Sequence, residues 1–134
     1  MQSSLTGRCF CGAVRYRCGS PLHPITLCHC ESCRRVSGAH MVGWLTVEAT
    51  TLVYTGKPRE FSSSPQTYRT FCSQCGTPLT YRQGSRPAEI DIILATLDQP
   101  ELLSPTSHIW MEDALTWDRP NDGLPQFAKS SQLK

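Results

Sequence analysis

Short runs of alternating hydrophobic and polar residues, separated by turn residues, extend along most of the chain. This pattern is typical of a mainly β protein. In the first extended segment, residues 5–18, Val14, Tyr16 and Cys18 point to one side, while Arg15 and Arg17 point to the other. The most strand-like run is residues 89–97. Further strands are expected at residues 25–30, 40–47, 52–55, 67–71, 79–82 and 108–111.

A short helix is predicted only at residues 31–37, with Gly38 as the residue that ends it. The strands at 67–71 and 79–82 flank a pair of cysteines, which predicts a hairpin with a cysteine turn at its tip. From residue 121 onward the chain is polar, and an irregular tail is expected.

The composition is that of an ordinary globular protein of 134 residues, with 39% hydrophobic and 18% charged residues. We therefore expect one domain over residues 1–134. A net charge of +2, with no basic run longer than Arg34-Arg35, argues against a nucleic-acid partner. No apolar run approaches the ~20 residues of a membrane span. The first residues lack the pattern of a signal peptide, so a cytoplasmic location is expected. The oligomeric state is left open.

Seven of the eight cysteines fall into three clusters, namely Cys9 with Cys11, Cys28 with Cys30 and Cys33, and Cys72 with Cys75. In a reducing cytoplasm, such spacings favour metal ligands over disulfides. Cysteines two apart on a strand share a face, and a C-x-x-C turn brings its two thiols together. Pairing the first cluster with the last predicts a closed structural zinc site of Cys9, Cys11, Cys72 and Cys75.

The middle cluster supplies only three thiolates, and two interpretations remain open. Its zinc could be structural, with a fourth ligand from Cys18, His29, His40 or His108. Alternatively, the fourth position could be open to water or substrate. An open tri-thiolate zinc carries a net charge of −1 and acidifies water weakly, so it suits a soft ligand such as a substrate thiol better than hydrolysis.

Three motifs carry a family resemblance: Cys9-Phe10-Cys11-Gly12, residues 28–38 (CHCESCRRVSG) and residues 71–77 (FCSQCGT). In this order they resemble the glutathione-dependent formaldehyde-activating (Gfa) family, over residues 7–127. The resemblance implies a β-tent fold of twisted antiparallel sheets with two zinc ions. Cys28, Cys30 and Cys33 would hold the catalytic zinc, and the other four clustered cysteines the structural one. The implied activity is that of a carbon–sulfur lyase, joining glutathione and formaldehyde into S-(hydroxymethyl)glutathione.

Glutathione carries two carboxylates, so basic residues should bind it. Arg34 and Arg35, just beyond the middle cluster, are the predicted substrate-binding residues, and the other arginines are read as solvated. His40 or His108 could transfer a proton. The actual thiol and electrophile are not identified by the sequence. Two other functions stay open, a non-enzymatic β-tent binding module stabilised by zinc and a thiol redox protein that uses the middle cluster.

Overall fold

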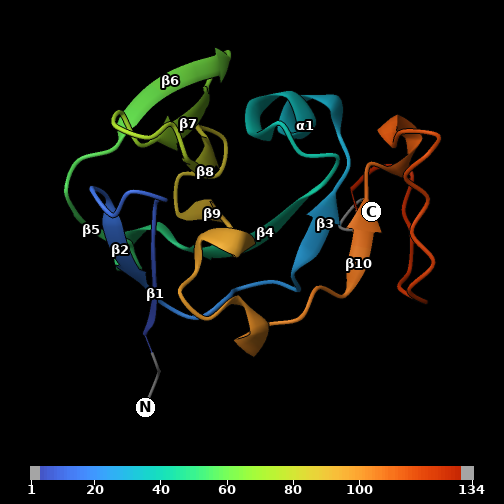
Figure 1. Cartoon of the computed structure of the whole chain (residues 1–134), viewed down its shortest axis with the longest axis horizontal. Helices are drawn as coiled ribbons and strands as arrows, with labels where there is room; N and C mark the ends of the chain where they lie inside the picture. Colours follow the sequence, from blue (N-terminus) through green and yellow to red (C-terminus); the bar gives the residue numbers. More distant parts are fainter. Residues whose placement is uncertain (1–3, 131–134) are drawn as a thin grey trace.

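The computed structural model describes residues 4–130 as two β-sheets and one short α-helix (Figure 1). The strands are β1 (Leu5–Arg8), β2 (Arg15–Cys18), β3 (Thr26–Cys28), β4 (Val42–Glu48), β5 (Val53–Thr55), β6 (Arg59–Ser64), β7 (Thr67–Phe71), β8 (Pro78–Gln83), β9 (Glu89–Ile93) and β10 (Ser107–Ile109). The helix α1 is Glu31–Ser37, and four short 3-10 turns complete the described elements. The predicted mainly β fold is confirmed. Within residues 4–130, no helix combines the length and apolarity needed to cross a membrane.

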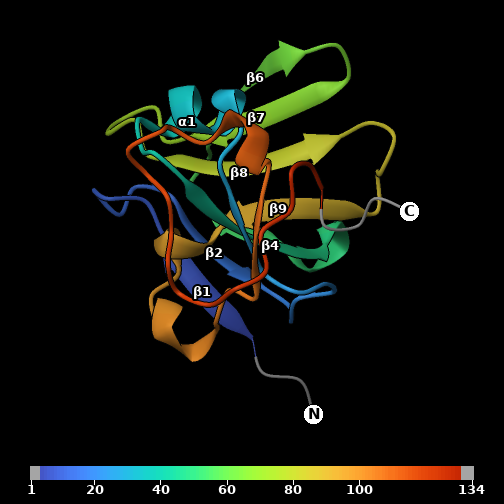
Figure 2. The ribbon, with the colours of Figure 1, turned by 90° about the vertical axis from the view of Figure 1, so that its right-hand side faces the viewer.

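The smaller sheet has the order β1-β2-β5 and is antiparallel. The larger sheet has the order β10-β3-β4-β9-β8-β7-β6, and only its first pair, β10 with β3, is parallel. Figure 2 shows β6, β7, β8 and β9 following one another down the larger sheet, with β1 and β2 beneath it. The hairpin of β7 and β8 is the one predicted from the sequence, with its cysteine turn between the strands.

The alternation of side chains on β4 separates the two faces of the larger sheet. Leu45 and Val47 are completely buried in the main core, which they share with Tyr16 of the smaller sheet. Trp44 points to the opposite face and joins a second cluster around Cys28. Because successive residues of a strand face opposite ways, one face of the larger sheet builds the core and the other is free to build a site.

The helix is predicted correctly in both extent and ending. Gly38 follows it in the left-handed conformation (φ 73°), and its amide donates to the Arg34 carbonyl oxygen at 2.8 Å. The N-cap is Cys30, whose sulfur accepts from the Cys33 amide.

Several predicted boundaries are wrong. Residues 5–18 form two strands separated by the turn that carries Cys9 and Cys11, and the strand predicted at 25–30 stops at Cys28. These cysteine pairs therefore meet in turns, not along one strand face. The strand predicted at 89–97 ends at Ile93 and continues as a 3-10 turn, and β10 ends before Trp110, which adopts a left-handed conformation. Strand β6 was not predicted.

Candidate functional site

The first cysteine set brings together two turns that lie far apart in the sequence. Cys9 and Cys11 lie in the turn after β1, and Cys72 and Cys75 lie in the turn between β7 and β8. All four sulfur atoms lie within 4.8 Å of one another. Cys11 Sγ is 3.7 Å from Cys9 Sγ and 3.8 Å from Cys72 Sγ. Tetrahedral zinc with Zn–S bonds of about 2.3 Å needs sulfur atoms ~3.8 Å apart, so the set fits zinc.

Backbone amides already point at these sulfur atoms. Val14 N–H donates to Cys9 Sγ at 3.3 Å, and Gln74 N–H donates to Cys72 Sγ at 3.3 Å. Hydrogen bonds to sulfur favour the thiolate form that binds metals. The Thr77 hydroxyl, 3.1 Å from Cys75 Sγ, contributes most to lowering the pKa of Cys75 to about 5. The cluster is thus prepared for a cation by the turns that hold it.

The second set lies where β3 passes into α1. Cys28 ends the strand, Cys30 caps the helix and Cys33 lies in its first turn, with all three sulfur atoms within 4.8 Å of one another. Hydrogen bonds from Cys28 and Cys33 lower the pKa of Cys30 to about 2, with a smaller contribution from the charge of Arg69. The hydrogen bonds to Cys30 and Cys33 in turn raise the pKa of Cys28. Three thiols this close can all ionise only beside a cation, and their donor chemistry fits zinc.

No fourth ligand joins this set among the described residues. The group contains only Cys28, Cys30 and Cys33. Of the four candidates from the sequence, Cys18 is buried in the main core, and burial raises its pKa to about 11. His40 Nδ1 instead contacts Asp118 Oδ2 at 2.6 Å.

The remaining two candidates, His29 and His108, bond to each other. His29 Nε2 lies 3.0 Å from His108 Nδ1, and His108 Nε2 lies 2.8 Å from Asp122 Oδ2. Both rings are completely buried. Burial, and then the charge of His108, lowers the pKa of His29, so its ring is held neutral. These histidines fasten the segment carrying Cys28 to β10 and the loop beyond it.

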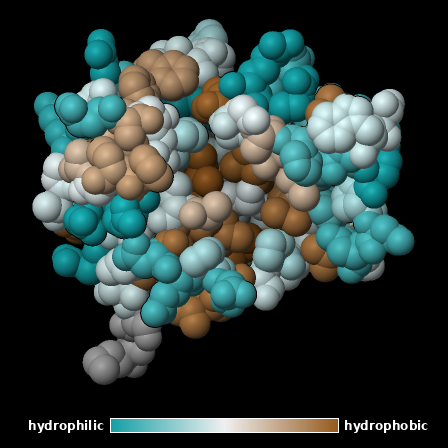
Figure 3. Space-filling view, in the orientation of Figure 1, coloured by the Kyte–Doolittle hydropathy of each residue, from teal (hydrophilic) through white to brown (hydrophobic). Residues whose placement is uncertain are grey.

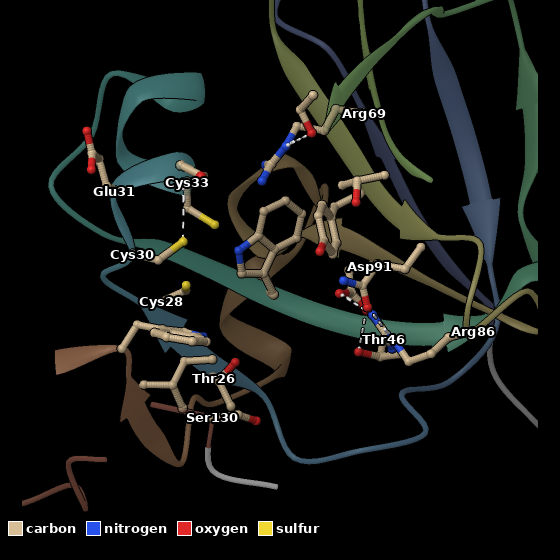
Figure 4. Close-up of a pocket in the computed structure, with 18 of the residues that line it drawn as sticks. Thr26, Cys28, Cys30, Glu31, Cys33, Thr46, Arg69, Arg86, Asp91 and Ser130 are labelled. Atoms are coloured by element: carbon tan, nitrogen blue, oxygen red, sulfur yellow. Dashed lines mark hydrogen bonds and ion pairs between the residues drawn. The ribbon is translucent and has the colours of Figure 1, made fainter. Parts of the chain in front are cut away.

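A cavity of about 730 Å³ opens beside the second cysteine set. One wall of the cavity is a row of directly paired residues across four strands: Thr46 on β4, Asp91 on β9, Tyr81 on β8 and Arg69 on β7. In Figure 4 the cysteines lie at one end of the cavity, and Arg86, Asp91 and Thr46 lie at the other. Figure 3, which views the molecule from the same side as Figure 1, shows apolar surface gathered in the hollowed middle of that face, with polar groups around it.

The polar end of the cavity is held together by ion pairs. Arg86 contacts Glu89 at 2.7 Å and Asp91 at 3.3 Å, and the Thr46 hydroxyl donates to Asp91 at 2.6 Å. Burial raises the pKa of Asp91 despite these partners. Sequence reasoning missed these residues, although polar side chains at alternating positions of apolar strands, such as Asp91 between Ile90 and Ile92, signal a polar face.

Arg34 and Arg35 do not line this cavity. Arg35 is exposed and pairs with Glu31 at 2.8 Å, one helical turn away. Arg34 is half-buried on the helix. Their predicted contact with substrate stays a prediction, while Arg69 and Arg86 are arginines that do line the cavity.

The fold and the site define a mainly β protein with two cysteine clusters suited to metal ions, one of them open to a cavity. A family model described as "Glutathione-dependent formaldehyde-activating enzyme" matches residues 4–113. The chain therefore belongs to this family, as its cysteine motifs suggested.

Curated relatives agree with this assignment. The chain is 30% identical to a protein of Halomonas elongata named "Putative glutathione-dependent formaldehyde-activating enzyme", with 84% of this chain and 78% of that protein covered. It is also 26% identical to an uncharacterised lyase of Schizosaccharomyces pombe, over 60% of this chain and 61% of that protein.

A solved structure shares the fold. The crystal structure of a Rhodobacter sphaeroides protein superposes with a TM-score of 0.59 and 20% identity, covering 91% of this chain and 98% of that one. This likeness supports the arrangement of strands described above.

Proposed function

We propose that this protein is a zinc-dependent carbon–sulfur lyase that joins a small thiol, such as glutathione, to formaldehyde or a related electrophile. The observation that carries the proposal is the second cysteine set, which has three sulfur ligands, no fourth ligand within residues 4–130 and a cavity at its open side. The family description and the lyase name of a relative support the same reaction class.

Cys28, Cys30 and Cys33 would hold the zinc, which when bound supplies a soft Lewis acid that favours the thiolate form of a thiol. The chain itself supplies the enclosure. Its cavity is large enough to hold a tripeptide thiol beside a small aldehyde, and Trp44 and Ile109 give part of its wall apolar surface.

In the proposed reaction, the thiol sulfur forms a bond to the carbonyl carbon, and the thiol proton is transferred to the carbonyl oxygen. Holding both reactants in one cavity converts a bimolecular encounter into an oriented one. Tyr81 lines the cavity, and burial raises its pKa, so its phenol keeps a proton to donate to the developing alkoxide. The proton released by the thiol then returns to the phenolate, so the thiol remains the net source of the proton. His40 and His108 are absent from the cavity lining, although the sequence made them candidates for this role. A cytoplasmic location, where the cluster thiols stay reduced, is part of the same proposal.

The test is metal analysis followed by titration of glutathione into protein whose second site holds cobalt. Two metals per chain and a thiolate-to-cobalt band that grows with glutathione support the proposal. Formation of S-(hydroxymethyl)glutathione from ¹³C-formaldehyde, followed by NMR, tests the reaction itself. A cobalt spectrum that does not change when thiols are added would refute the proposed function and favour a non-enzymatic binding module. Metal release with disulfide formation would favour the redox function.

A further inference from the structure

Arg69 is a buried cation in the wall of the cavity. It lies on β7 and is only 4% exposed. Its guanidinium stacks over the Tyr81 ring, 4.7 Å from the ring centre, and its Nε donates to Ser63 Oγ at 3.2 Å. In Figure 4 the Arg69 side chain reaches down from β7 toward the space between the cysteines and the polar end.

The hydrogen-bonding capacity of Arg69 is not used up by the protein. Its Nη1 atom is buried and has no hydrogen-bond partner among the described residues. In the same part of the chain, no Asp or Glu oxygen lies within ion-pairing distance of it. A buried charge is normally paired, and a buried N–H without an acceptor is costly. Arg69 therefore points to an acceptor that the protein itself does not supply.

Comparison with three other arginines shows that none of them combines the features of Arg69. Arg82 also stacks on a tyrosine, 4.4 Å from the Tyr68 ring centre, but it is 42% exposed and pairs with Glu60. Arg86 lines the same cavity and has two carboxylate partners. Arg34 has an unpartnered buried Nε but does not line this cavity. Arg69 combines burial, an unpartnered N–H and a position in the cavity wall.

We propose that Arg69 binds a carboxylate of the thiol substrate, so that the site selects thiols that carry a negative charge close to the sulfur. This inference rests on the proposed function, because it takes the second cysteine set as the place where the sulfur is held. Guanidinium groups bind carboxylates through strong, charge-assisted hydrogen bonds, and the low dielectric around a buried guanidinium such as that of Arg69 strengthens them. Arg69 is then a specificity-determining residue of the reaction.

Arg69 could instead serve the metal cluster alone, by offsetting its negative charge. The two roles differ in a measurable way. A counter-charge strengthens the binding of every thiolate by the same factor, whereas a carboxylate-binding residue strengthens only thiols that carry a carboxylate. The ratio of affinities for two thiols that differ only in that group separates the roles.

The probes are N-acetylcysteine and N-acetylcysteine amide, titrated into the cobalt-loaded full chain and followed by the thiolate-to-cobalt band. Wild-type protein should bind N-acetylcysteine at least about tenfold more tightly than the Arg69→Gln variant does, as expected for loss of a charge-assisted hydrogen bond. Affinity for the amide should change less than about threefold, so the acid preference falls in the variant. Arg69→Lys should keep part of the preference, and Arg82→Gln, the matched control on the exposed side, should keep all of it.

Equal weakening of both thiols in Arg69→Gln would overturn the inference in favour of the counter-charge role. An unchanged preference would overturn it outright. Should Arg69→Gln fail to fold, the wild-type protein still decides, because equal affinity for acid and amide rules out a carboxylate subsite. A wild-type cobalt spectrum that responds to neither thiol refutes the proposed function itself, and the inference falls with it. A spectrum that responds to both thiols without preference refutes the inference alone.

Discussion

Replacing Cys72 by serine should make the protein unfold far more easily, because it removes one of the two hairpin ligands of the metal cross-link to the first turn. The largest possible effect is complete loss of this cross-link. The linked sulfur atoms of Cys11 and Cys72 belong to residues 61 positions apart. A metal that clips such a loop acts on the unfolded chain as a disulfide does, and the loop-closure relation gives about 4 kcal/mol for a loop of this length. This is a large share of the 5–15 kcal/mol that holds a typical domain together.

The assay is urea unfolding of the metal-loaded protein, followed by tryptophan fluorescence. With a slope of about 2 kcal/mol/M, a loss of about 4 kcal/mol lowers the unfolding midpoint by ~2 M. Cys18→Ser is the matched control, since Cys18 is equally buried (1% exposed for both residues) but belongs to neither cluster. It measures the cost of burying a hydroxyl where a thiol was. Equal midpoints for Cys72→Ser and Cys18→Ser would refute the cross-link.

Three further predictions follow from the same structure. Cys30→Ser should lose one metal per chain by elemental analysis and keep its far-ultraviolet circular dichroism, because serine also caps helices well; unfolding like Cys72→Ser would contradict this. Gly56→Ala should lower the melting temperature much more than Gly123→Ala. Both glycines have φ near +80°, but only at Gly56 would the new Cβ collide with the Ala13 carbonyl oxygen. Finally, burial raises the pKa of Cys18 from 9.0 to about 11, so the unfolded chain releases this proton first and stability falls as pH rises from 9 to 11. Cys18→Ala should lose stability less steeply over that range in urea titrations, and parallel curves would contradict the assignment.

The cysteine sets could be foreseen because their chemistry is local. Spacings of two and three residues bring sulfur atoms together in tight turns, whatever the rest of the fold does. The sequence argument that cysteines two residues apart meet on one face of a strand was nevertheless wrong, since Cys30 caps a helix and Cys11 lies in a turn. Helix α1 was equally local, bounded by its own glycine.

Features set by long-range packing were missed. All six residues of β6 are exposed, so the strand carries no hydrophobic alternation, and only pairing with β7 defines it. Arg69 is buried beside Tyr81 of β8 and Ser63 of β6, the strands on either side of β7, and its local sequence does not reveal these contacts. Arg34 and Arg35 attracted attention because they follow the cysteines in sequence, but a helix directs successive residues to different sides. Proximity along the chain was a poor guide to the cavity.

The difference in span between the two cysteine sets has a consequence for how the protein is made. The ligands of the second set lie within a six-residue stretch and can bind metal as soon as that stretch leaves the ribosome. Cys9 and Cys11 must wait for Cys72 and Cys75, and at 5–20 residues per second the 61 positions between Cys11 and Cys72 take about 3 to 12 s to translate. During this interval the first two thiols are exposed to oxidants and to competing metals. Under the proposed zinc dependence, we therefore expect the yield of intact protein to depend on the supply of metal during synthesis as well as on affinity in the finished fold.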